Sequence, residues 1–302
     1  MVVKYEIKEY SSFGRCLCIE NDTMELYVTI DIGPRIIKFN LKGKDNMLYE
    51  DKQLLVYRDE PNLKEMFGKD ARWNVYGGHR FWVSPEKHPQ TYYPDNTPVE
   101  YAVDGNKFSF YAPKQIFTGW QEIIEITVAD NDASVSVKHI LTNMSDRPQE
   151  AAIWALSVAD TGSVAYVKQS ANQTGLLPNR VLMLWPYSDY KDSRFYMDNE
   201  YVGLIQDPAC EKPFKLGTNN TDGVIVCSNH DTVFKISYDY VNGAEYADNG
   251  CSFESYLCKY YLELEAFSPL SLVKPGETRE FTEKWELYPE KSTDIKDLAK
   301  YF

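Results

Sequence analysis

Residues 261–287 read YLELEAFSPLSLVKPGETREFTEKWEL, and this stretch decides the fold class of the chain. Over Tyr261–Phe267, apolar side chains alternate with acidic or aromatic ones, and the same period of two returns over Arg279–Tyr288. Successive side chains of a β-strand point to opposite faces, so this period predicts two strands that each bury one face. The apolar positions of the two runs are Leu262, Leu264, Ala266, Phe281, Trp285 and Leu287.

Runs with the same period recur along the chain, separated by turn-forming residues such as Asp104-Gly105-Asn106 and Asn242-Gly243. Further strand-like runs lie at Tyr5–Tyr10, Glu25–Asp31, Arg35–Asn40, Lys107–Ala112, Ile124–Val128, Val135–Leu141, Arg180–Trp185, Gly223–Cys227 and Phe234–Tyr238. Many short strands with this punctuation predict an all-β fold, a large antiparallel β-sandwich or barrel. No linker-like stretch or internal repeat interrupts the pattern, so we expect residues 1–302 to form a single domain.

Helical patterns are few and short. Glu60–Gly68 is compatible with a turn of helix, and Ser292–Tyr301 with a short helix that Ser292 caps. Two longer segments, Asn74–Pro98 and Tyr187–Asn220, lack clean alternation and are rich in Tyr, Pro, Asp and Asn. Long irregular segments in a compact fold are usually functional loops, so we expect them to cover one face of a sheet.

The composition is that of a globular protein with an acidic surface. The 302 residues include 32 Lys and Arg against 45 Asp and Glu, which gives a formal net charge of −13. Such a surface repels phosphate groups, so we expect neither nucleic acid nor an anionic membrane as a partner. The 23 Tyr and 6 Trp residues offer flat apolar faces with a polar group at the edge, which suits sugar ligands.

The compartment follows from apolar runs and cysteine spacing. The N-terminal residues alternate apolar and charged side chains, without the apolar centre of a signal peptide, and no run reaches 18 apolar residues. We therefore expect a cytoplasmic protein whose six cysteines are reduced. Cys16 and Cys18 lack a second close pair, so we expect no metal site.

The segment NVYGGHRFWVSPEKH, residues 74–88, concentrates side chains that could bind a ligand. Its Gly-Gly pair allows a sharp bend or a close approach to a ligand. An imidazole, a guanidinium and a large ring follow at once and could bind a polyhydroxylated or anionic molecule. The alternative is a hairpin with the arginine on the surface and the tryptophan in the core. The candidate residues are Asn74, His79, Arg80 and Trp82.

Two carboxylates share the second face of the run at 261–267. Glu263 and Glu265 point away from the leucine face, and a tight hairpin would bring Glu254 of the preceding run close to Glu263. Adjacent carboxylates repel, which raises one pKa toward a value useful for proton transfer. The alternative is a solvated strand face. Lys215 in FKLGTNN could place an amine over a pocket, and His139 shares an apolar face and is expected in the core.

The motifs DIGPRIIKF, YGGHRFW, LTNMSD and the stretch 261–287 follow one another in an order that resembles the galactose mutarotase-like (aldose 1-epimerase-like) superfamily, in particular a bacterial branch of it. The resemblance spans residues 35–287 and implies a large antiparallel β-supersandwich. Enzymes of that superfamily interconvert sugar anomers: a glutamate takes the proton of the anomeric hydroxyl, and a histidine protonates the ring oxygen.

Carried over by position, Glu265 in LELEAF matches the general base, with Glu263 as the near alternative. The histidine has no counterpart, because Trp154 stands at its place in the strand after LTNMSD. A tryptophan can stack on a pyranose face but cannot act as an acid. His79 after the Gly-Gly pair is the substitute acid that the resemblance leaves open.

Three functions are compatible with these residues. The first is acid–base catalysis on an aldose or related sugar without a cofactor, in which Arg80, Trp82, Trp154 and Lys215 position the sugar. The second is a carbohydrate-binding or regulatory module of the same fold without turnover. The third is binding of a sugar phosphate or sugar acid, for which Arg35, Arg80 and Lys215 supply cationic groups. Each function takes a small carbohydrate as the partner, and the oligomeric state is left open.

Overall fold

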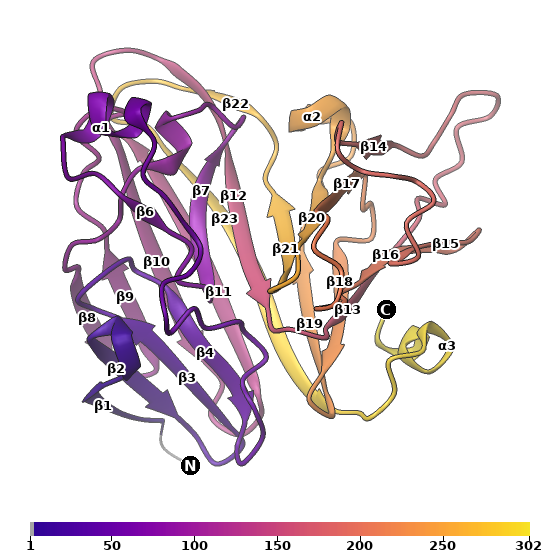
Figure 1. The fold of residues 1–302 in the computed structure, drawn as a ribbon, viewed down its shortest axis with the longest axis horizontal. Coiled ribbons are helices and arrows are strands. Elements are labelled where there is room, and N and C mark those ends of the chain that lie inside the picture. The colour runs from indigo at the N-terminus through magenta and orange to yellow at the C-terminus, as the bar shows by residue number, and fades with distance from the viewer. Residues whose placement is uncertain (1–2) are drawn as a thin grey trace.

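The computed structural model describes residues 3–302, which form two large antiparallel sheets of 11 and 10 strands (Figure 1). A third sheet of two strands, β5 (Tyr57–Arg58) and β6 (Trp73–Asn74), lies apart from them. The prediction of an all-β antiparallel sandwich is thereby confirmed. Among the described residues, no helix is long and apolar enough to cross a membrane.

The 11-stranded sheet carries the candidate site. Its strand order places sequence-distant segments side by side, with β12 between β7 and β21. In spatial order its strands are β1 (Lys4–Glu9), β2 (Arg15–Glu20), β3 (Met24–Thr29), β4 (Ile36–Leu41), β7 (His79–Ser84), β12 (Gln149–Ala159), β21 (Leu262–Phe267), β20 (Phe253–Leu257), β17 (Phe214–Thr218) and β14 (Leu182–Leu184), and β22 (Ser271–Val273) pairs with β12.

The 10-stranded sheet supplies the other half of the sandwich. Its long central strand β23 pairs with β11 on one side and β19 on the other. In spatial order its strands are β15 (Phe195–Met197), β16 (Tyr201–Ile205), β13 (Val164–Lys168), β18 (Val224–Asn229), β19 (Thr232–Tyr238), β23 (Thr278–Pro289), β11 (Ser134–Asn143), β10 (Trp120–Val128), β9 (Lys107–Tyr111) and β8 (Glu100–Asp104).

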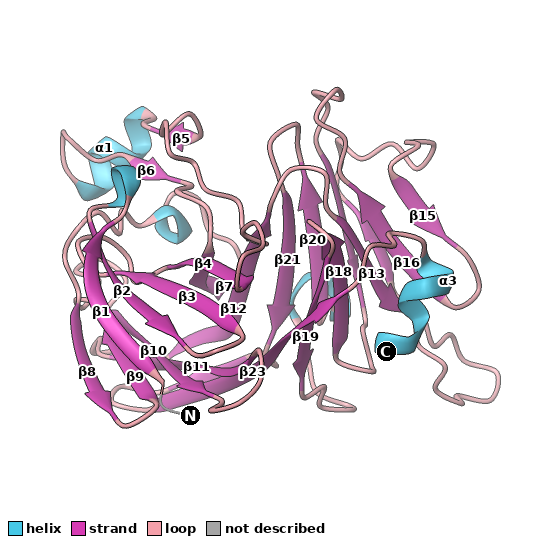
Figure 2. Cartoon of the chain, turned by 90° about the horizontal axis from the view of Figure 1, so that it is seen from below, coloured by secondary structure: helices cyan, strands magenta, loops and turns pink. Residues whose placement is uncertain are grey.

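The helices lie outside the sheets, as Figure 2 shows. Short α-helices are α1 (Pro61–Phe67), α2 (Ala247–Gly250) and α3 (Ile295–Leu298), and 3₁₀ turns lie at Ser11–Phe13, Gln90–Tyr92 and Ala299–Tyr301. The predicted C-terminal helix begins later than expected, because Asp294 and not Ser292 accepts the hydrogen bond from the Lys296 amide. The Ser292 hydroxyl instead donates to Asp297.

The main core fills the space between the two large sheets. The leucine face of β21 contributes Leu262 and Leu264 to it, and β23 contributes Phe281 and Trp285, as the alternation predicts. A second apolar cluster lies on the opposite face of the 11-stranded sheet, where loops and α1 cover it. This second cluster includes Trp73, Tyr92, Trp154, Tyr261 and Phe267. The outer face of that sheet is therefore covered and partly apolar.

Candidate functional site

A pocket of about 490 Å³, here called the aromatic pocket, opens on the outer face of the 11-stranded sheet. Its floor comes from neighbouring strands, because Trp82 of β7 pairs with Trp154 of β12, and Trp154 pairs with Phe267 of β21. Its aromatic lining is Tyr57, Trp73, Trp82, Tyr92, Trp154, Trp185, Tyr187, Tyr256 and Tyr261, and its charged lining is Arg58, Glu60, Glu86, Lys215 and Glu263. Tyr and Trp rings each combine a large apolar face with a polar group, so the pocket is both apolar and hydrogen-bonding.

The structure brings Lys215 and two of the carboxylates together at the bottom of this pocket. The Lys215 Nζ lies 2.7 Å from Glu254 Oε2 and 3.0 Å from Glu265 Oε2. Burial lowers the pKa of Lys215, but Glu265 and Glu254 outweigh it and hold that pKa well above its usual range. An ammonium has three N–H groups, and these contacts use two, so the third can donate to a ligand.

Register decides which carboxylates meet. The hairpin sets Glu254 of β20 opposite Glu265 of β21. The prediction that Glu254 would approach Glu263 is therefore wrong, because the actual partner lies two positions further along β21. Burial and the mutual repulsion of the two groups raise the pKa of Glu254 well above its usual range. Burial likewise raises the pKa of Glu265, against the opposing effect of Lys215. These two carboxyl groups therefore hold the lysine.

Glu265 lies beneath the pocket and does not line it. Its side chain is fully buried, and its Oε2 accepts hydrogen bonds from the indole Nε1 of Trp154 at 2.9 Å and from Lys215. Trp154 stacks on Phe267 and meets Trp82 edge to face, with ring centroids 5.3 and 5.1 Å apart. Trp154 thus lines the pocket on one side and covers Glu265 on the other.

Glu263 is the carboxylate of β21 that reaches the pocket. Its side chain is 13% exposed, and its Oε1 lies 3.8 Å from Nη2 of Arg80. Burial and the nearby Glu265 raise the pKa of Glu263 to about 8, although Arg80 and Lys215 oppose the shift. Arg80 lies against the rings of Trp73 and Trp82, and its three guanidinium nitrogens are buried without a hydrogen-bond partner. Because the pKa of Glu263 is about 8, its carboxyl group can take up or release a proton near neutral pH.

The structure does not bring His79 to the pocket, which removes it as the acid. Alternation on β7 turns Arg80 toward the pocket, and His79 therefore faces the second sheet and is fully buried. Its Nε2 lies 2.7 Å from Nε2 of His139, and its Nδ1 lies 2.9 Å from the Ser157 hydroxyl. His139, expected in the core, is indeed buried there.

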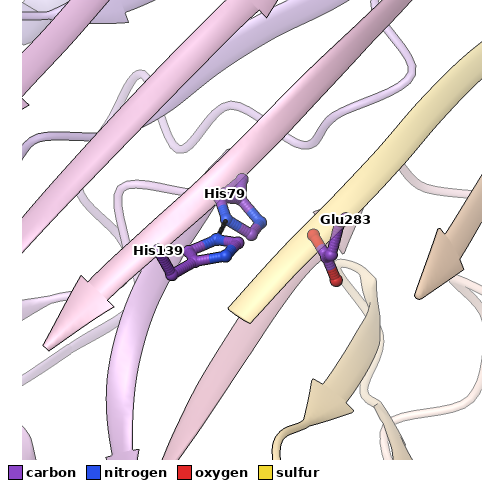
Figure 3. Close-up of side chains that lie close together, drawn as sticks. All are labelled: His79, His139 and Glu283. Atoms are coloured by element: carbon purple, nitrogen blue, oxygen red, sulfur yellow. Dashed lines mark hydrogen bonds between the residues drawn. The ribbon is translucent and has the colours of Figure 1, made fainter. Parts of the chain in front are cut away.

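His79, His139 and Glu283 of β23 offer three metal-ligand atoms within 4.8 Å of one another (Figure 3). Sequence spacing could not reveal this group, because its members lie on three strands. His139 Nδ1 must carry a hydrogen for the Phe281 carbonyl at 3.1 Å, so its Nε2 accepts from His79. Two nitrogens bound tetrahedrally to zinc would lie roughly 3.3 Å apart. The observed 2.7 Å is the spacing of a hydrogen bond.

Arg35 and Asn74 also lie away from the aromatic pocket. The Arg35 Nη2 donates to Asp95 Oδ2 at 2.7 Å and faces the Asn74 carbonyl at 3.4 Å. The Asn74 amide in turn donates to the Tyr76 hydroxyl. The two residues therefore connect the segment before the Gly-Gly pair with the loop after β7, which contains Asp95.

Several residues of the aromatic pocket were not predicted from the sequence. Arg58, Trp185, Tyr187 and Tyr256 line the pocket but follow no motif. The Tyr-rich segment at 187–220 gave a partial signal, because its first residue, Tyr187, lines the pocket. The expectation that the two irregular segments only cover a sheet is wrong, since 187–220 contains β15, β16 and β17 and 74–98 contains β7. Glu283 lies in the core and not in the pocket. It could have been predicted as a buried carboxyl group, because the period of two places it between Phe281 and Trp285 on an apolar face.

No protein-family model and no curated protein matches the sequence. Solved structures do resemble the fold. A galactose mutarotase-like protein from Lactobacillus casei is 11% identical, with a TM-score of 0.57 over 90% of this chain and 100% of that one. A proposed aldose 1-epimerase from Klebsiella pneumoniae is 12% identical, with a TM-score of 0.62 over 99% of this chain and 86% of that one.

A longer protein also shares the fold. The TPR-domain containing protein from Parabacteroides distasonis is 14% identical, with a TM-score of 0.62 over 93% of this chain. This chain spans only 48% of that protein's length. The two sheets, their antiparallel order and these likenesses lead to one conclusion: the chain has the galactose mutarotase-like fold.

Proposed function

We propose that the aromatic pocket binds a small carbohydrate and that the chain interconverts the anomers of an aldose, with Glu263 as the proton carrier. The observation that carries this proposal is the meeting of Glu263, Lys215 and several aromatic rings in one pocket. Aldose 1-epimerase-like chemistry needs a base for the anomeric hydroxyl and a donor for the ring oxygen. Glu263 and Lys215 are the two groups in the pocket that suit these roles.

The proposed reaction assigns one role to each side chain. Ionised Glu263 takes the proton of the anomeric hydroxyl, a carbonyl forms at that carbon, and the bond to the ring oxygen breaks. The ring oxygen receives that electron pair while the free N–H of Lys215 donates to it. Glu254 and Glu265 hold Lys215 in place, and the tryptophan faces orient the ring. Closure on the other face of the carbonyl, with the proton returned, gives the other anomer.

Proton NMR of freshly dissolved sugars tests this function. We expect α/β equilibration of at least one sugar in a panel of aldoses to be faster at micromolar protein. Glu263→Gln keeps the shape but removes the base, and the rate should fall by about 10²–10⁴-fold. Glu265→Gln is the matched control on the same strand and should cost less, because Glu265 does not line the pocket. A larger loss from Glu265→Gln would return the base to that residue.

The same experiment separates turnover from binding. If sugars stabilise the protein against heat but equilibrate at the spontaneous rate, the chain is a carbohydrate-binding module and Glu263 is a hydrogen-bonding residue. If no sugar either binds or equilibrates faster, the proposed function is wrong.

One observation favours an anionic sugar as a second candidate ligand. The guanidinium of Arg80, which lies 3.8 Å from the pocket residue Glu263, is buried without a hydrogen-bond partner. Guanidinium groups pair well with phosphate and carboxylate oxygens. Glucose 6-phosphate and glucuronate should then bind more tightly than glucose, with the advantage shrinking at high salt. Equal affinities for glucose and both anions would exclude this candidate.

A further inference from the structure

A second cavity, here called the edge cavity, lies where β7 separates from β4. These two strands pair only at Ile36 and His79 within the described residues, so the rest of β7 is open on that side. The edge cavity has a volume of about 340 Å³ and touches both large sheets, through β7 and the first residues of β10. Its lining includes Trp82, Ser84, Tyr93, Phe117, Gln115 and Glu122.

The edge cavity and the aromatic pocket share a wall residue. Trp82 lines both spaces. A smaller inner cavity of about 80 Å³ shares Asp95 and Glu122 with the edge cavity and is also lined by Arg80. Arg80 lies 3.8 Å from Glu263, which lines the aromatic pocket. Trp82 is therefore a shared wall of the two spaces, and Arg80 links the inner cavity to Glu263.

Polar atoms in these walls lack partners. Ser84 is 1% exposed and lines the edge cavity, yet its hydroxyl has no hydrogen-bond partner. Asp95 Oδ1 and the Arg80 guanidinium are in the same state. Burial of a polar atom without a partner costs free energy, so each of these atoms calls for a partner, which water or a ligand group can supply. Hydroxyl groups of a sugar can both donate and accept, which suits a hydroxyl, a carboxylate and a guanidinium at once.

Aromatic side chains also line the edge cavity. Phe117, which is 54% exposed, and Tyr93 both contribute to it. Gln115 donates to Glu122 Oε1 at 2.9 Å, and burial with the nearby Asp95 raises the pKa of Glu122 to about 8. A largely neutral carboxyl group there can donate a hydrogen bond as well as accept one.

We propose that the edge cavity is a second carbohydrate subsite, so that the ligand is an oligosaccharide. Its terminal unit occupies the aromatic pocket, and the next unit lies beyond Trp82 against Phe117, Ser84 and Glu122. This proposal rests on the proposed function, because it takes the aromatic pocket to hold a sugar. It names the substrate class as sugars of two or more units.

Isothermal titration calorimetry tests the subsite with glucose and galactose against maltose, maltotriose, cellobiose, cellotriose and lactose. We expect at least one longer sugar to bind about tenfold more tightly than its monosaccharide. Phe117→Ala and Ser84→Ala should each reduce that gain and leave the affinity for the monosaccharide unchanged. Ile116→Ala is the matched control, because Ile116 is 78% exposed beside Phe117 but does not line the cavity.

The outcomes separate the subsite from the function. If a monosaccharide binds and no longer sugar binds more tightly, the subsite is wrong and the proposed function stands. A gain with chain length that survives both Phe117→Ala and Ser84→Ala also overturns the subsite. The absence of binding by every sugar overturns both proposals.

Discussion

Trp154 joins the pocket to the carboxylate beneath it. Its ring lines the aromatic pocket, and its indole N–H donates to Glu265. Because the side chain is only 4% exposed and packs on Phe267, Trp154→Ala should destabilise the fold by about 3–5 kcal/mol. Trp154→Phe keeps an aromatic ring at this position but removes the N–H that donates to the buried carboxylate of Glu265. This loss should cost about 1–3 kcal/mol of stability.

Urea unfolding of the two variants measures these costs. Sugar affinity of Trp154→Phe should stay close to that of the unmodified protein, because the ring face remains. Unchanged stability of Trp154→Ala would show that the indole does not hold Glu265 in place.

Glu283 makes stability depend on pH. Burial raises its folded pKa to about 8, well above the usual value of 4.5, and only the Trp285 N–H opposes the shift. The folded state therefore keeps a proton that the unfolded state releases. This contribution to stability is fully present below pH 4.5 and is lost as pH rises through 8.

Glu283→Gln isolates that contribution. The amide oxygen can still accept from Trp285, but the group no longer titrates. The free energy of unfolding of the variant should exceed that of the unmodified protein by a growing margin between pH 4.5 and pH 8. Urea unfolding at several pH values measures this margin. A constant difference across that range would mean that Glu283 is ionised in the folded protein.

The turn into β7 shows how one element is positioned by close backbone contact. Gly77 and Gly78 both have positive φ, and a Cβ on Gly78 would collide with the Ile36 carbonyl oxygen of β4. The amide of Gly78 donates to the Tyr49 carbonyl at 2.9 Å. The Gly-Gly pair therefore allows the backbone at Ile36 and Tyr49 to pack closely against it. It does not serve the close approach to a ligand that the sequence also allowed.

Gly78→Ala should consequently destabilise or unfold the protein. The control is Gly105→Ala, which has a similar positive φ of 59° in a hairpin turn with open space around it. That control should cost only the strain of the backbone, roughly 1 kcal/mol. Thermal unfolding compares the two variants. Equal melting temperatures would show that the contact with β4 yields without cost.

At the scale of the whole molecule, the strand order assembles the site from distant segments. Lys215 and Glu265 are 50 residues apart, and they meet because β20 lies between β17 and β21. Trp82 and Trp154 are neighbours because β7 and β12 pair. Each of these strands has a neighbour on both sides: β7, β12 and β21 lie in the middle of the sheet, and β20 and β17 lie between them and the edge strand β14 (Figure 1). That residues 1–302 form one domain stays a prediction.

The fold class and the faces of individual strands can be predicted from local sequence patterns. Alternation is local, since each residue's face follows from its neighbours, so the leucine face of β21 and the acidic face with Glu263 and Glu265 were both predictable. The acidic, Tyr-rich composition adds two expectations, a small sugar as ligand and no nucleic acid as partner, and both stay predictions.

Which groups meet, and how deeply they are buried, depends on packing between distant strands. Glu254 opposes Glu265 because of the hairpin register, and His79 faces the second sheet because Arg80 takes the pocket side. Glu263, not Glu265, reaches the pocket because Trp154 and Lys215 from other strands cover Glu265. Period-2 patterning repeats identically at both glutamates, so it cannot distinguish them. Depth of burial depends on packing from distant strands, and no local pattern encodes it.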